Sequence, residues 1–155
     1  MTEELNPIRE TIHAILDWFP EKITQFLKWL HPLKVVPVEK DCWWTIGEYQ
    51  HEPAVQLIVK LMVTNRSESQ ISLIDFVPID RKIKRNIFSV IHRLIGNHAV
   101  DPIIPPNTTE EIKIMSVFKP VISNKSIDLE LKTILKNSFG KSNRTSIRFK
   151  SVHKK

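Results

Sequence analysis

The hydrophobic pattern of this chain changes its period near residue 40, and this change limits the fold more than any other feature. Before about residue 32, apolar residues recur at the spacing of an α-helix. After about residue 41 they alternate with polar residues, as in the segment VQLIVKLMVT (55–64), which is typical of strands with one buried face. We therefore expect a mainly β fold preceded by one amphipathic helical segment.

The expected helical segment covers residues 7–31. Asn6 and Pro7 suit a helix cap and a first helical position. Pro20 removes one backbone hydrogen bond, so we expect a kinked helix or two helices that share a face. The apolar face needs a cover, and packing on the following domain is the favoured interpretation. A partner protein or a membrane surface are the alternatives, with Trp18, Phe26 and Trp29 as candidate contact residues.

Four further features indicate an antiparallel β-sandwich. The segments 110–118, 126–135 and 146–152 alternate between apolar and polar residues. Turn chemistry separates them, with Asn65-Arg66-Ser67 after one strand and Gly140 in the loop of a final hairpin. We expect residues 1–40 to form the helical segment packed on the body, 41–152 the β-sandwich, and 153–155 a basic tail. The Asn-X-Ser/Thr sequences are interpreted as turns, not as glycosylation sites.

One segment does not follow the alternating pattern. In residues 80–95, DRKIKRNIFSVIHRLI, the apolar positions Ile83, Ile87, Val90, Ile91 and Leu94 have helical spacing. Asp80 and Gly96 suit the two ends of a helix. We expect a short helix at about 82–95, with a pair of strands as the alternative.

The body resembles immunoglobulin-like and fibronectin-like β-sandwich domains over residues 54–152. The resemblance rests on KLMVTNRSESQISLIDF, on the Pro-led IIPPNTTEEIKI and on the hairpin LKTILKNSFGKSNRTSIRF. The Cys…Trp…Cys pattern of antibody domains is absent, so the resemblance is a loose one. It implies a sandwich that serves as a binding or spacer module, although a fold does not fix a function.

Trp43 and Trp44 are the most informative aromatic pair. Neighbours in a strand point to opposite faces, so if Cys42 and Trp44 lie in the interior, Trp43 points outward. Ile58 and Met62 occupy the outer face of the next strand. The N-terminal helix covering this face is the favoured interpretation, and an aromatic binding patch that includes Trp43 is the alternative.

Catalytic and cofactor signatures are absent from the sequence. The chain has 155 residues with three glycines and one cysteine, which leaves no G-x-S-x-G, P-loop or dinucleotide motif and no internal disulfide. Cys42 is interpreted as an inert core thiol. The six histidines match no zinc pattern, so we expect no metal site, no cofactor and no enzymatic activity.

The net charge of +6 is unevenly distributed. Residues 81–100 and 141–155 contain basic groups and no acids, which permits an anionic partner. A solvated surface is the favoured interpretation; phosphate binding becomes credible if both segments meet on one face. The candidate anion-binding residues are Arg81, Lys82, Lys84, Arg85, Arg144, Arg148 and Lys150.

The sequence therefore favours a non-catalytic protein-interaction or structural module with an unknown protein partner. A peripheral membrane module anchored by residues 7–31 is the second hypothesis, and a nucleic-acid-binding protein is the third. A single cysteine and the lack of a recognisable export signal lead us to expect a cytoplasmic location, peripheral to a membrane if the second hypothesis holds.

Overall fold

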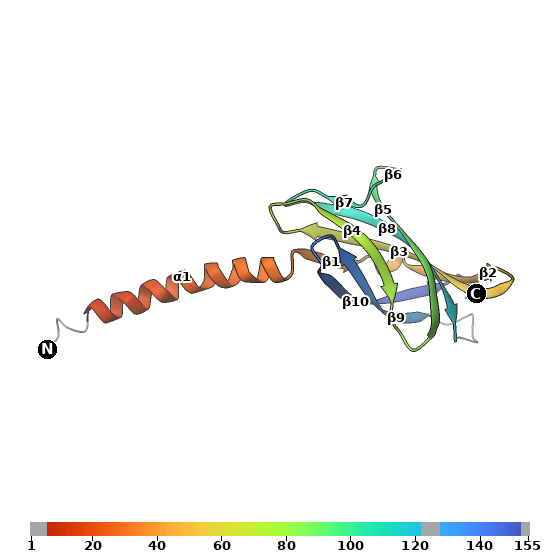
Figure 1. The fold of residues 1–155 in the computed structure, drawn as a ribbon, viewed down its shortest axis with the longest axis horizontal. Coiled ribbons are helices and arrows are strands. Elements are labelled where there is room, and N and C mark those ends of the chain that lie inside the picture. Colours follow the sequence, from red (N-terminus) through yellow and green to blue (C-terminus); the bar gives the residue numbers. More distant parts are fainter. Residues whose placement is uncertain (1–5, 122–127, 153–155) are drawn as a thin grey trace. The chain divides into compact units, whose positions relative to one another are not determined.

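The computed structural model describes residues 6–121 and 128–152. The chain divides between Pro32 and Leu33 into two compact units, a helical one and a β body, which are described separately below. Figure 1 shows the helix in red and orange and the body from orange to blue. Residues 33–37, which the sequence analysis assigned to the N-terminal segment, form strand β1 of the body.

The N-terminal unit contains one helix, α1 (Asn6–Leu30). It runs through Pro20 as a single element, because the apolar phase continues across the proline and only one hydrogen bond is lost there. The Thr24 hydroxyl donates to the Pro20 carbonyl at 2.9 Å. The predicted helix is thus confirmed, and the two-helix alternative is not what the chain adopts. Among the described helices none combines the length and the apolar character needed to span a membrane.

The described part of the body contains ten strands and one short 3-10 helix. Their bounds are β1 (Leu33–Pro37), η1 (Glu39–Asp41), β2 (Trp43–Tyr49), β3 (Glu52–Asn65), β4 (Ile71–Pro78), β5 (Ile83–Ile95), β6 (His98–Val100), β7 (Ile103–Ile104), β8 (Thr109–Pro120), β9 (Leu129–Asn137) and β10 (Ser142–Ser151). The strands are hydrogen-bonded in the order β6-β5-β8-β3-β2-β10-β9-β4-β7, and β1 also pairs with β3. The mainly β fold predicted from the sequence is confirmed.

The sheet folds back on itself to enclose the core. One half consists of β6, β5, β8, β3, β1 and β2, and the other of β10, β9, β4 and β7. The halves join where β10 pairs with β2 in parallel, at Lys150↔Trp43 and Ser151↔Trp44. The pairings within each half are antiparallel, so the predicted antiparallel sandwich needs this one correction.

At the open side of the fold, side chains connect β5 to β4. These strands stand far apart in the strand order, yet Ser89 Oγ of β5 donates to the Phe76 carbonyl of β4 at 2.7 Å. Asn86 Nδ2 donates to the Pro78 carbonyl at 2.9 Å. These side-chain bonds occupy carbonyls that would otherwise be available for pairing with another strand.

The core lies between the two halves and follows the predicted alternation. The inward residues of β3, β8, β9 and β10 are buried: Val55, Leu57, Val59, Leu61, Val63, Ile112, Ile114, Phe118, Leu129, Leu131, Leu135, Ile147 and Phe149. Cys42 and Trp44 are fully buried as well, which confirms their predicted inward orientation. The described residues of this cluster all lie at or after Leu33.

The segment predicted as a short helix at about 82–95 is strand β5. Two bulges in its pairing with β8, between Ile83 and Arg85 and between Asn86 and Phe88, break the two-residue alternation. The remaining apolar spacing imitates a helical period. Gly96, expected as a helix cap, has φ +59 in the turn between β5 and β6. The β-branched residues of β5 and its pairing with β8 favour a strand over a helix in this segment.

The turns confirm the chemistry predicted for them. The buried Asn65 accepts the Ser67 N–H at 2.9 Å and donates to the Ser69 and Ile104 carbonyls, so it closes the β3–β4 turn and ties it to β7. Asp75 lies at a bulge of β4 and accepts the Phe76 N–H. Gly140, in the β9–β10 loop, has φ +69, a conformation that glycine adopts without steric cost.

Candidate functional site

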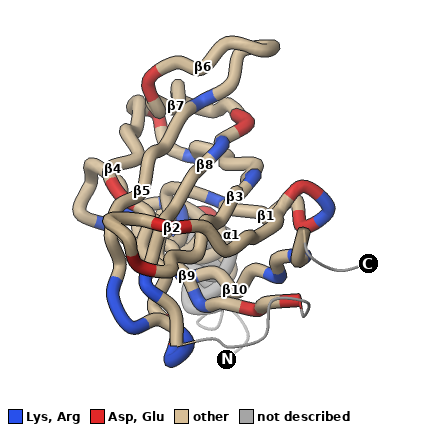
Figure 2. The backbone as a smooth tube through the Cα atoms, turned by 90° about the vertical axis from the view of Figure 1, so that its right-hand side faces the viewer, with Lys and Arg blue, Asp and Glu red and all other residues tan. Residues whose placement is uncertain are grey.

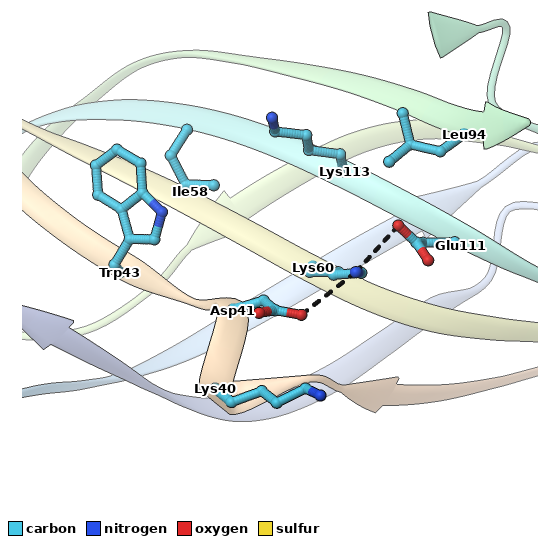
Figure 3. Close-up of a pocket in the computed structure, with 8 residues that line it drawn as sticks. All are labelled: Lys40, Asp41, Trp43, Ile58, Lys60, Leu94, Glu111 and Lys113. Carbon is cyan, nitrogen blue, oxygen red and sulfur yellow. Dashed lines mark ion pairs between the residues drawn. The ribbon is translucent and has the colours of Figure 1, made fainter. Parts of the chain in front are cut away.

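The outward face of β2, β3, β8 and β5 contains a pocket. Alternation places Trp43, Ile58 and Lys60 opposite the buried residues of the same strands. The pocket encloses about 330 Å³ and is shown in Figure 3. We call it the Lys60 pocket; its lining residues are Lys40, Asp41, Trp43, Ile58, Lys60, Leu94, Glu111 and Lys113.

Lys60 is held by two carboxylates at the centre of this pocket. Its Nζ lies 3.2 Å from Glu111 Oε1 and 3.3 Å from Asp41 Oδ2 (Figure 3). The hydrogen bonds that Lys60 Nζ donates to Glu111 and then to Asp41 raise the pKa of Lys60 above its ordinary value. Lys60 is therefore charged and engaged, which leaves it unsuited to act as a base.

Lys113 is directly opposite Lys60 across the β3–β8 pair. Like charges at directly opposite positions repel each other, and the carboxylates of Asp41 and Glu111 offset that repulsion through Lys60. Lys113 itself is exposed and, within the described residues, forms no ion pair. Lys40, also exposed, forms no ion pair among the described residues either, so the pocket combines two available cations with the apolar side chains of Trp43, Ile58 and Leu94.

A second pocket of about 330 Å³ continues from the first one toward β6. The two share Leu94 and Lys113, so they form one continuous depression across β3, β8 and β5. The second pocket adds mostly apolar lining, and its full set is Val90, His92, Leu94, Asn97, Ala99, Lys113 and Met115. The Gln56 amide donates to Met115 Sδ at 3.2 Å, which fixes one side of this lining.

The beginning of the first basic segment, Arg81 and Lys82, lies beside the second basic segment on the other half of the body. The turn that follows β4 lies against β9: Ile79 N–H donates to the Lys132 carbonyl at 2.8 Å, and Lys82 Nζ donates to the Glu130 carbonyl at 2.9 Å. β10 pairs with β9 along its length, with Arg144 opposite Ile134 and Arg148 opposite Glu130. Figure 2 shows blue on this turn and on β9 and β10 beside it.

We call this surface the basic face. It consists of Arg81, Lys82, Lys132, Lys136, Arg144, Arg148 and Lys150, which are all exposed. Five of the seven residues predicted as anion-binding are therefore part of it, and β9 adds Lys132 and Lys136, which were not among the predicted residues. Lys84 and Arg85 are in β5, where Arg85 is opposite Lys119 of β8, so they belong to the half that contains the Lys60 pocket. The contribution of Lys132 and Lys136 depends on the β4–β9–β10 pairing, which no local pattern reveals.

Asp80 fixes the turn of the basic face. Burial alone would raise the pKa of Asp80, but the Lys82 N–H at 3.1 Å, the Lys82 charge and the Lys132 backbone together lower it below its ordinary value. Lys82 Nζ lies 3.7 Å from Asp80 Oδ1. Asp80 thereby pairs with Lys82, whose Nζ donates to the Glu130 carbonyl of β9.

The candidate contact residues of α1 are exposed where the structure describes them. Phe26 is 56% and Trp29 65% exposed, and their rings stack with centroids 6.0 Å apart. The Trp18 side chain lies outside the described residues. The prediction that this helix packs on the body stays a prediction, because the positions of the two units relative to one another are not determined.

The remaining candidate residues from the sequence are Cys42 and the histidines. Cys42 is buried, with Sγ 3.4 Å from the Val38 carbonyl, and burial raises the pKa of its thiol, as expected for an inert core cysteine. His13, His31, His51, His92 and His98 are exposed. In the part of the chain that the structure covers, no three His, Cys, Asp or Glu side chains gather into a group that could hold a metal ion.

Comparisons with known proteins give only remote similarity. No family model matches the chain, and no curated protein matches its sequence. Among solved structures, the chain is similar to the copper-bound PCuAC domain from PmoF2, with 12% identity, a TM-score of 0.47, and coverage of 79% of this chain and 95% of that one.

Two further solved structures are also similar to most of this chain. The apo PCuAC domain from PmoF1 has 12% identity, a TM-score of 0.44, and coverage of 79% of this chain and 96% of that one. The yeast GGA1 GAE domain has 16% identity, a TM-score of 0.25, and coverage of 67% and 95%. The bound copper is a property of the PmoF2 domain.

Proposed function

We propose that the β body is a non-catalytic interaction module that binds a protein segment in the Lys60 pocket and its continuation. The proposal is supported by the combination of apolar lining with two cations, Lys40 and Lys113, that form no ion pair among the described residues. Trp43, Ile58 and Leu94 supply the kind of apolar surface on which binding hot spots are built. The loose resemblance to immunoglobulin-like sandwiches is in keeping with such a role.

The chemistry of the lining defines the partner. Lys40, Lys60 and Lys113 face Asp41 and Glu111, so the pocket has an excess of one positive charge. A partner segment with an apolar side chain next to an Asp or Glu would fill the apolar part and pair with Lys113. Charge complementarity of this kind contributes specificity and association rate in addition to the affinity from apolar burial.

Selection from a phage-displayed library of random peptides tests this proposal. We expect enriched peptides to share an apolar residue adjacent to an acidic one. Trp43→Ala should weaken a selected peptide at least about tenfold, the loss typical of a buried aromatic anchor. Lys113→Glu should weaken it through repulsion of the acidic residue. Fluorescence polarisation with the labelled peptide measures both effects.

Arg66→Glu is the matched control, because it makes the same charge change in the exposed β3–β4 turn, outside both pockets. It should leave peptide binding unchanged. A library that yields no enriched peptide, or peptides that bind Trp43→Ala and Lys113→Glu as tightly as the unmodified chain, would show that this surface is not a docking site.

A further inference from the structure

The basic face has a strong charge imbalance. At the outward positions of β9 and β10, Glu130 is the acidic residue, whereas Lys132, Lys136, Arg144, Arg148 and Lys150 are basic. Glu130 also accepts a hydrogen bond from Ser146 Oγ at 3.0 Å. None of the five basic side chains forms an ion pair within the described parts of the chain. Their charge is therefore available to an anionic partner.

Apolar side chains adjoin this charge. Val121 is 66% exposed, and its N–H donates to the Lys82 carbonyl at 2.9 Å, which places it beside the basic turn. Phe139 is 45% exposed in the loop that joins β9 to β10. Lysines and arginines next to exposed apolar residues suit the boundary between headgroups and acyl chains of a bilayer.

The composition of the face favours lipid over single-stranded nucleic acid. The described outward positions of β9 and β10 contain lysine, arginine, serine, Glu130 and Ile134, and no aromatic residue. Proteins that bind single strands use aromatic side chains on which bases stack. The basic face offers charge without such a stacking surface.

The helix α1 supplies a second, independent feature that favours membrane binding, an exposed apolar face. Its described apolar residues Phe19, Ile23, Phe26 and Leu27 are between 44% and 56% exposed, and their spacing puts them on one face. Lys22 and Lys28 lie in the same stretch, and Trp29 adjoins Phe26. Buried apolar area and electrostatic attraction to anionic lipids both add to the membrane affinity of an amphipathic helix, so the two features reinforce each other.

We propose that this chain binds the surface of an anionic membrane, with the basic face on the lipid headgroups and the apolar face of α1 in the interfacial layer. This inference does not depend on the peptide-binding proposal, since it uses the opposite half of the body and the helix. The two proposals can therefore fail separately.

Vesicle co-sedimentation of the full chain tests the inference. Vesicles of phosphatidylcholine and phosphatidylserine in equal amounts should sediment the chain, and vesicles of phosphatidylcholine alone should sediment much less. Binding should weaken as salt increases, because screening shortens the reach of the headgroup charge. No sedimentation with the anionic vesicles, or equal sedimentation with both kinds, would overturn the proposal.

Matched pairs of variants separate the contribution of the basic face to vesicle binding from that of the apolar face of α1. Arg148→Gln should weaken vesicle binding about fivefold, the usual share of one basic residue near an anionic surface. Arg66→Gln removes the same charge from the β3–β4 turn and should change binding little. Phe26→Glu should weaken binding at least about tenfold through loss of apolar burial, whereas Gln25→Glu adds the same charge on another face of α1 and should not.

Nucleic acid is the competing occupant of the basic face. Duplex DNA of random sequence should compete weakly with anionic vesicles. If the DNA instead displaces the chain from vesicles completely, and Phe26→Glu leaves both activities unchanged, then the basic face is a polyanion site and the membrane proposal is wrong. Circular dichroism of each variant shows whether a loss of binding is a loss of folding.

Discussion

At the scale of single residues, Asn65 is the side chain on which the β3–β4 connection most depends. Its Nδ2 donates to the Ser69 carbonyl at 2.7 Å and to the Ile104 carbonyl at 3.0 Å, and it is fully buried. Asn65→Asp keeps the shape but places a carboxylate against two carbonyls. We expect the free energy of unfolding to fall by about 3 kcal/mol or more, from lost bonds and an unpaired buried charge. Urea denaturation measures it.

Asn107→Asp is the control for this substitution. Asn107 is exposed in a turn with φ 55, a conformation that aspartate tolerates as well. The same chemical change there should alter the free energy of unfolding by less than about 0.5 kcal/mol. Equal effects at positions 65 and 107 would mean that the bonds of Asn65 contribute little to stability.

Single residues also show how far alternation predicts a site. The period of two placed Trp43 outward and Trp44 inward, and both orientations agree with the structure. Lys60 could be assigned to the outer face in the same way. Lys113 and Leu94 could not be assigned to the same pocket, because they reach it only through the pairing of β3 with β8 and of β8 with β5.

At the scale of elements, β5 depends on contacts outside itself. Ser89 Oγ donates to the Phe76 carbonyl and lies 2.9 Å from Ser116 Oγ in a second hydrogen bond. Ser89→Ala leaves both groups without this partner, so we expect a loss of about 1–3 kcal/mol in the free energy of unfolding. Ser146→Ala, at an exposed position of β10, should cost less than about 0.5 kcal/mol. Urea midpoints that move equally would contradict the role of Ser89.

The same element marks the limit of local pattern analysis. Strands β3, β8, β9 and β10 keep a regular alternation and were predictable from the sequence. β5 was not, since its two bulges shift the apolar residues into helical spacing and only the partner strand determines its conformation. The junction of β10 with β2 was equally hidden, because it pairs residues near the two ends of the body.

At the scale of the whole molecule, the charge distribution follows from topology. Each basic segment was recognisable in the sequence, but the sequence did not show that the two segments lie side by side in the fold. The segments come together because the turn before β5 bonds to Lys132 and Glu130 of β9, and β9 pairs with β10. Strand pairing between residues far apart in the sequence brings the two segments together. Such pairing is not visible in a short stretch of sequence.

The division of the chain at Pro32 leads to the last prediction. The described core residues of the body all lie at or after Leu33, and β1 and β2 together occupy one edge of β3. We therefore expect residues 33–155 alone to fold, with a cooperative thermal transition at the same Tm as the full chain. Anionic vesicles should bind this fragment at least about tenfold more weakly, because the apolar signal of α1 is gone. A lower Tm for the fragment would instead show that α1 packs on the body, as its apolar periodicity predicted, and unchanged vesicle binding would remove the helix from the membrane proposal.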